Sequence, residues 1–189
     1  MSKIVLCEGL FDQVILETLI KVNSLAITVR IYEGKNGLKG FMRTLMSQLD
    51  SGEITTLAVT RDADENGDGA FTSVRDTLKM MGFSNLPAQN GGFSGAAPKT
   101  GIFIVGPGGR GEMEDLCLAS MQNRPEFSCV DEYFKCMKQA EPKAKARAWV
   151  WLAGSQTDFE FSVRKMGEKA YWNWDHPAFG PLKQFLRAM

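Results

Sequence analysis

Short apolar segments alternate with amphipathic segments over the first two thirds of the chain, and this alternation restricts the fold more than any other feature. The apolar segments predict strands at residues 3–7, 27–32, 55–60 and 101–105. The segments that follow them repeat apolar residues at helical spacing and predict helices at residues 11–22, 38–49, 70–81 and 112–121. Strands joined by helices form mostly parallel sheets with right-handed crossovers. We therefore expect an α/β protein with a Rossmann-like, mostly parallel central sheet and flanking helices.

After residue 124 the sequence no longer contains segments that predict strands. Helical patterns predict further helices at residues 130–140, 143–153 and 181–188. We expect residues 1–124 to form the α/β core and residues 125–189 to form a helical C-terminal extension packed on the same domain. Core packing is the favoured explanation for the four tryptophans of the extension, and a platform for stacking nucleic-acid bases is the alternative. They are Trp149, Trp151, Trp172 and Trp174.

The charges of the chain balance, with 22 Lys and Arg residues against 22 Asp and Glu residues. A neutral chain has no overall attraction to polyanions, so a polybasic nucleic-acid binder is excluded. The extension does contain a basic stretch, which either contacts phosphates or forms a solvated helix face. It consists of Lys135, Lys138, Lys143, Lys145 and Arg147. No apolar run approaches the roughly 20 residues of a membrane span, so we expect no membrane association and a cytoplasmic protein.

Acidic residues follow the predicted strands at the edge of the sheet where ligands bind. Glu8 ends the first strand, and Asp62 and Asp64 end the third. Asp12 lies one helical turn after Glu8, and Glu114 begins the helix after the fourth strand. Alternate residues of an extended segment share a side, so Asp62 and Asp64 should point the same way. Because ligands bind beyond the carboxyl ends of parallel strands, we expect these five carboxylates to converge on one crevice.

Converging carboxylates repel one another, which raises their pKa values unless a cation neutralises them. The chain has a single histidine and four cysteines without zinc-ligand spacing, so the ligands of such a cation would all be oxygens. Oxygen ligands favour Mg²⁺ or Mn²⁺ over zinc. A helix cap or a solvent-facing charge is the alternative for any single acid, above all for those that follow the fourth strand.

Two segments resemble motifs of the Toprim domain, the fold shared by topoisomerases, bacterial primases and the OLD (overcoming lysogenization defect) nucleases. The segment IVLCEGLFD, residues 4–12, resembles the glutamate motif, and LAVTRDAD, residues 57–64, resembles the DxD motif. The later segments GIFIVGPGGRGEMEDLCL, residues 101–118, and YWNWDHPAFGPLKQFL, residues 171–186, are similar to a group of small stand-alone Toprim proteins. The resemblance covers nearly the whole chain and implies a Toprim-like fold.

The resemblance also implies a metal site and an activity. Glu8 corresponds to the Toprim glutamate, which acts as a general acid or base or as a metal ligand, so it is the candidate catalytic residue. Asp62 and Asp64 correspond to the metal-binding pair. Asp12 and Glu114 resemble the remaining ligands of the two-metal site in OLD nucleases. The implied activity is Mg²⁺- or Mn²⁺-dependent cleavage of nucleic-acid phosphodiester bonds by a nuclease or nickase, with DNA favoured over RNA.

The chain departs from the better-known Toprim proteins in two respects. It lacks the tyrosine-bearing module of topoisomerases, and the late basic residue of OLD nucleases has only weak candidates in Lys99 and Arg110. OLD nucleases join their Toprim domain to an ATPase, so the resemblance implies a separately encoded ATPase as a partner and leaves a homo-oligomer open. Two alternatives for the function remain: a non-catalytic subunit that binds a metal or a nucleotide, and a hydrolase of a small phosphate ester.

Two further segments permit other interpretations, which we disfavour. Residues 106–111, GPGGRG, form a GxGxxG motif after a strand, and Asp131 follows at the distance expected of a ribose ligand in a dinucleotide site. Acids at the start of the following helix would repel a pyrophosphate there. Residues 62–69 imitate the start of an EF-hand calcium loop, but Ser73 stands where the bidentate glutamate would be.

Overall fold

The computed structural model describes residues 2–34, 36–95, 97–155, 163–167 and 171–189. The strands in these ranges are β1 (Ser2–Cys7), β2 (Thr28–Ile31), β3 (Ile54–Asp62), β4 (Phe93–Ser94) and β5 (Lys99–Val105). The α-helices are α1 (Leu10–Val22), α2 (Gly37–Asp50), α3 (Gly67–Met80), α4 (Met113–Ala119), α5 (Ser128–Cys136), α6 (Ala144–Ser155) and α7 (Gly180–Ala188). The predicted strands and helices are confirmed, and β4 is an addition. None of the helices in these ranges combines the length and apolar character that crossing a membrane requires.

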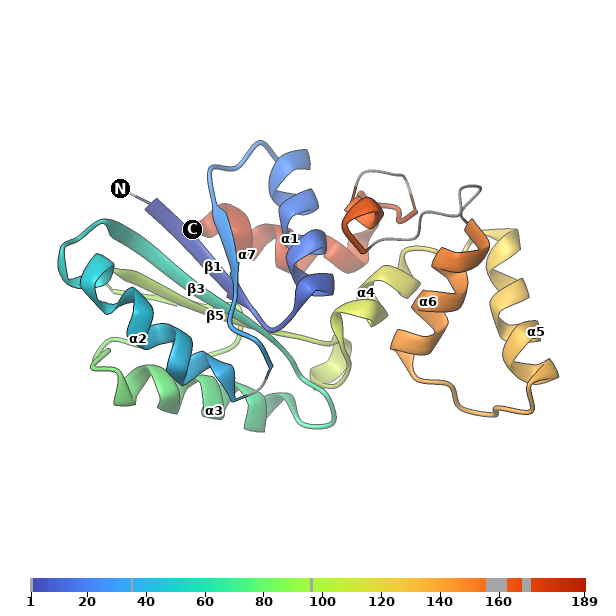
Figure 1. Cartoon of the computed structure of the whole chain (residues 1–189), viewed down its shortest axis with the longest axis horizontal. Helices are drawn as coiled ribbons and strands as arrows, with labels where there is room; N and C mark the ends of the chain where they lie inside the picture. Colours follow the sequence, from blue (N-terminus) through green and yellow to red (C-terminus); the bar gives the residue numbers. More distant parts are fainter. Residues whose placement is uncertain (1, 35, 96, 156–162, 168–170) are drawn as a thin grey trace.

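The five strands form one sheet in the order β2-β1-β3-β5-β4. The first four strands in this order run parallel, and β4 is antiparallel to β5. Helices α2 and α3 cover one face of the sheet, while α1 and α7 cover the other (Figure 1). The chain therefore has a Rossmann-like α/β fold, which confirms the predicted fold class.

Apolar side chains on the two faces of the sheet form two core clusters. Ile4 and Leu6 of β1 pack with α2 and α3, whereas Val5 and Cys7 pack with α1 and the C-terminal helices. Successive residues alternate in this way because side chains of a strand point to opposite faces. A strand that is apolar on both faces must lie inside the sheet. This requirement places β1 and β3 side by side in the middle, with their carboxyl ends at the same edge.

The segments after residue 124 contribute to the same core cluster as α1. Helix α7 returns to the sheet, where the ring of Phe185 stacks on Phe93 with centroids 4.7 Å apart and meets Phe103 at 5.2 Å. Helix α6 packs on α4, and α5 lies beyond it, away from the sheet (Figure 1). The chain end is therefore fixed on β5, while α5 and α6 extend the molecule past the carboxyl edge of the sheet.

The tryptophans of the extension serve the core and do not form one exposed platform. Trp151 and Trp172 are buried, and Trp149 and Trp174 are partly buried. The ring of Trp174 lies 5.5 Å from that of Phe179. The favoured explanation, core packing, is confirmed for Trp151 and Trp172.

Candidate functional site

Glu8 and Asp62 lie on neighbouring parallel strands at the carboxyl edge of the sheet. Glu8 directly follows β1, and Asp62 is the last residue of β3. The two strands pair with Leu6 opposite Val59, so the residues two positions further on, Glu8 and Arg61, are neighbours as well. Accordingly, Nε of Arg61 lies 3.3 Å from Oε1 of Glu8. The edge predicted from the sequence thus carries two acids and a guanidinium group.

Two helices bring further carboxylates to this edge. Asp12 lies in the first turn of α1, where its Oδ2 accepts a 3.0 Å hydrogen bond from the N–H of Gly9. The N–H of Met113, the first residue of α4, donates to Oδ1 of Asp62 at 3.0 Å. This bond ties the start of α4 to the end of β3. Glu114 follows immediately and is buried, with 4% of its surface exposed.

Burial and mutual repulsion raise the pKa values of these carboxyl groups. The pKa of Asp62 rises from 3.8 to about 9, first because the group is buried and then because of the charges of Asp12, Glu114 and Glu8. The pKa of Asp12 rises from 3.8 to about 7, chiefly through burial and then through Glu114. Burial also raises the pKa of Glu114. The structure therefore brings four of the five predicted acids close enough for their charges to interact.

Two basic side chains oppose this accumulation of negative charge. Arg61 pairs with Glu8, and Lys145, at the start of α6, lowers the pKa values of Asp12 and Glu114. Neither residue is among the site residues predicted from the sequence. Arg61 lies within the LAVTRDAD segment and Lys145 within the basic stretch, which are the only sequence signals for them. Their contacts depend on the strand register and on the packing of α6, which no local pattern encodes.

Removing the charge of Arg61 should destabilise the fold in metal-free buffer. Arg61 and Glu8 have side chains only 14% and 16% exposed, so the ion pair between them would be lost in a place that water reaches poorly. We expect Arg61→Met to lower the free energy of unfolding by about 1 to 3 kcal/mol, measured by urea denaturation. Ser73→Ala is the control, since it removes only the hydrogen bond that Arg61 Nη1 donates to Ser73. Equal stability of Arg61→Met and parent would contradict the importance of the pair.

Asp64 lies at the same edge in a backbone conformation that the sequence did not predict. Its φ is 50°, so the extended conformation that would place it on the same side as Asp62 ends before this residue. Its N–H donates to the carbonyl of Gly111 at 3.0 Å, and its own carbonyl accepts from the N–H of Gly111 at 2.7 Å. Asp64 therefore joins the end of β3 to the loop before α4, and the strand periodicity that predicts a common side for Asp62 and Asp64 ends at Asp62.

The two weak candidates for a late basic residue lie at different ends of β5. Lys99 is the first residue of β5, at the opposite end of that strand from the acids. Its Nζ donates to the carbonyl of Ala188 at 2.6 Å and lies 4.8 Å from the centre of the Phe93 ring. Arg110 is exposed in the loop before α4. Lys145 is thus the basic side chain of the extension that acts on the acids of the site.

The carboxylates suit a hard divalent cation in their chemistry but do not form a complete cage. Their donor atoms are all oxygens, and Asp12 and Asp62 each use one oxygen for a backbone hydrogen bond. Among the described residues, no group of three or more His, Cys, Asp or Glu side chains is arranged to hold one metal ion. Mg²⁺ commonly takes only one or two protein carboxylates and keeps several waters. The residues therefore fit a partly hydrated Mg²⁺ or Mn²⁺ and would not fit a metal that needs a full set of protein ligands.

The glycine motif does not provide a dinucleotide site. Helix α4, which follows it, has seven residues and carries acids in its first turn, where a pyrophosphate would have to lie. Asp131, the candidate ribose ligand, lies on helix α5 and pairs with Arg147 of α6. The arrangement of strand, glycine loop, helix and acidic strand end that binds a dinucleotide is therefore not formed here.

Comparison with known proteins identifies the family of the chain. The family model described as "Protein of unknown function (DUF3226)" matches residues 2–189, which includes the sheet, the acidic edge and the C-terminal extension. No curated protein and no solved structure is significantly similar. The chain belongs to the DUF3226 family.

Proposed function

We propose that this protein is a Toprim-type phosphodiesterase of the cytoplasm, dependent on Mg²⁺ or Mn²⁺, that cleaves or nicks nucleic acid, with DNA as the preferred substrate. The observation that carries the proposal is the convergence of Glu8, Asp12, Asp62 and Glu114 at the carboxyl edge of a parallel sheet. Buried acids that raise one another's pKa values are costly in a purely structural role, and they are typical of functional sites. A divalent cation would neutralise them and make their ionised forms favourable.

The roles of the residues follow from their positions. One or two carboxylates near the end of β3 would hold a partly hydrated cation: Asp62 and its neighbours Asp12 and Glu114 are the first candidates, with Asp64 on the adjoining loop. Glu8 would be the proton-transfer group or an additional ligand, oriented by its ion pair with Arg61. Lys145 would contact the negatively charged phosphodiester near Asp12. A bound Mg²⁺ or Mn²⁺ would supply Lewis-acid polarisation of a phosphoryl oxygen.

The neutral charge of the chain supports a division of labour with a partner. A chain without net positive charge supplies little autonomous affinity for a polyanion. We therefore propose that a separately encoded ATPase grips the substrate and that this chain contributes the cleavage site. A homo-oligomer would serve the same purpose by doubling the contacts to a duplex.

A cleavage assay with purified protein tests the proposal. Supercoiled plasmid and circular single-stranded DNA would be incubated with Mn²⁺, Mg²⁺ or EDTA, with and without the ATPase recovered from the native host at low salt. We expect Mn²⁺-dependent nicking that the ATPase increases. Efficient hydrolysis of a small phosphate ester without cleavage of either DNA would support the small-substrate alternative. Metal binding without hydrolysis of any substrate, with the ATPase present, would support a non-catalytic subunit.

Lys145 offers a specific test of substrate contact. Lys145→Gln should reduce the cleavage rate about tenfold, which corresponds to roughly 1.4 kcal/mol of activation free energy, because a charge facing the phosphodiester is lost. Lys143→Gln is the matched control, since Lys143 is an exposed residue of the same basic stretch. Initial rates should be measured at two salt concentrations, because contacts to phosphate weaken with salt. Equal rates for the two variants would remove Lys145 from the site.

A further inference from the structure

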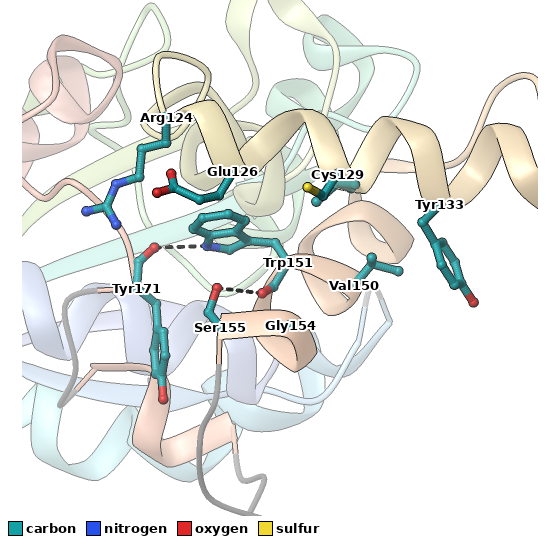
Figure 2. A pocket seen from close by; sticks show the side chains of 10 residues that line it. Arg124, Glu126, Cys129, Tyr133, Val150, Trp151, Gly154, Ser155 and Tyr171 are labelled. Atoms are coloured by element: carbon teal, nitrogen blue, oxygen red, sulfur yellow. Dashed lines mark hydrogen bonds between the residues drawn. The ribbon is translucent and has the colours of Figure 1, made fainter.

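A cavity lies between helices α5 and α6, in the C-terminal extension. Its volume is about 640 Å³, within the range of small-molecule sites. Figure 2 shows the residues around it, which come from the segment before α5, from both helices and from position 171. They are Arg124, Glu126, Cys129, Val130, Tyr133, Val150, Trp151, Gly154, Ser155 and Tyr171. The cavity is separate from the acidic edge and shares none of its residues.

Rigid aromatic surfaces form part of the wall of this cavity. Nε1 of Trp151 donates a 3.0 Å hydrogen bond to the carbonyl of Tyr171, which fixes the orientation of the indole (Figure 2). The ring of Trp151 also meets that of Phe127 edge-on, with centroids 5.7 Å apart. Tyr133 extends the aromatic surface and is about half exposed. Trp151 is 7% exposed, so it offers a ligand only the part of its ring that lines the cavity, and this fixed flat surface favours a planar aromatic ligand.

Polar groups at the end of the cavity narrow the class of ligand. Arg124 and Glu126 lie at the end next to Trp151, away from Tyr133, and provide a cation and an acceptor (Figure 2). Ser155, whose hydroxyl donates to the carbonyl of Trp151 at 2.7 Å, adds an acceptor oxygen. A purely apolar ligand would remove water from these groups without replacing their hydrogen bonds. A heterocycle with donors and acceptors on its edge, joined to an anionic group, matches both the rings and the charges.

We propose that the cavity between α5 and α6 binds a nucleotide, with the base against the small part of Trp151 that is open to the cavity and the phosphate at Arg124. Glu126 would accept from the edge of the base, as carboxylates do from exocyclic amino groups. The ligand is either a free nucleotide or an unpaired nucleotide of a single-stranded nucleic acid. Both sources present the same chemistry, a base with its phosphate. Gly154 leaves room for it, because a Cβ added there would meet nothing within 4 Å.

This inference goes beyond the proposed cleavage and can be tested without it. Gly154 lies nine positions after Lys145 in α6, which at 1.5 Å per residue is about 14 Å along the helix. None of Glu8, Asp12, Asp62 and Glu114 lines the cavity, so nucleotide binding should persist in EDTA. If nucleotide binding fails, the proposed cleavage is not affected. If cleavage is absent, the proposed nucleotide binding is not affected.

The test is a calorimetric titration in EDTA with AMP, GMP, CMP and UMP and with single-stranded ten-nucleotide oligomers of each base. Gly154→Leu places a side chain in the cavity and should weaken binding at least about tenfold. Gly40→Leu is the matched control, because Gly40 is also an exposed helical glycine with open space around its Cβ position. We expect Gly40→Leu to bind like the parent. Absence of saturable binding to every probe up to millimolar concentration would overturn the proposal, as would equal affinity of Gly154→Leu and the parent.

A second variant tests the contact to phosphate. The parent should bind AMP at least about fivefold more tightly than adenosine, and Arg124→Gln should abolish this preference while still binding adenosine. If Arg124→Gln keeps the full preference, the assignment of the phosphate is wrong. The same titrations identify the source of the ligand. Tighter binding of an oligomer than of its mononucleotide indicates a single strand, and equal or weaker binding of the oligomer indicates a free nucleotide.

Discussion

Asp62→Asn should reduce the metal-dependent cleavage rate by at least about 100-fold, since even outer-shell partners of a metal site cost 10- to 100-fold when they are replaced. Asparagine keeps the Oδ1 that accepts the hydrogen bond from Met113, so the junction of β3 and α4 should survive. It loses the negative charge of Asp62, on which the proposed cation binding depends. The measurement is the initial rate of plasmid nicking with Mn²⁺, for the chain together with the proposed ATPase partner.

The control for this variant is Asp76→Asn, an exposed aspartate of α3 at which the same loss of charge should leave the rate unchanged. Calorimetric titration with Mn²⁺ provides an independent readout. The double variant Asp62→Asn, Asp64→Asn should show no heat of binding where the parent does. If the double variant titrates with Mn²⁺ as the parent does, the assignment of the metal site to the end of β3 is wrong.

The metal-free protein should lose stability as the pH rises from 5 to 8.5. The pKa of Asp62 is raised from 3.8 to about 9 and that of Asp12 from 3.8 to about 7, so between these values the folded chain binds more protons than the unfolded chain. Stability therefore falls with increasing pH, by on the order of 1 kcal/mol per pH unit for each group. The contribution is fully present below pH 3.8 and is lost as the pH passes the raised values. Urea denaturation in EDTA at a series of pH values measures this slope.

Two further measurements test whether the buried acids cause this loss of stability with increasing pH. Asp62→Asn should flatten it and should be at least as stable as the parent at pH 8, because no charge has to be buried at that position. Mn²⁺ should restore the stability of the parent and should do so more strongly at high pH, because cation binding needs the ionised carboxylates. A metal-free parent with the same stability at pH 5 and pH 8.5 would contradict the burial of these acids.

The strands and helices could be predicted from the sequence because their signals are local. The apolar run of β1 and the helical spacing of α1 indicate those elements within about 20 residues, and strand–helix alternation indicates a parallel sheet. The position of Glu8 and Asp62 at strand ends follows directly, since parallel strands place their carboxyl ends at one edge. The two residues of β4 were not predictable, because two residues contain no period and their pairing with β5 is a tertiary contact.

The electrostatic character of the site was decided only by the tertiary structure. The pairing of Arg61 with Glu8 requires the register between β1 and β3, which lie about 50 residues apart in the chain. The effect of Lys145 on Asp12 requires α6 to pack on α4, and the left-handed backbone of Asp64 requires its two hydrogen bonds to Gly111. The sequence by itself determined which elements form and which acids stand at the strand ends, because periodicity and topology act locally. Burial, register and the partners of each charge arise from contacts between distant segments, so only the folded chain determined them.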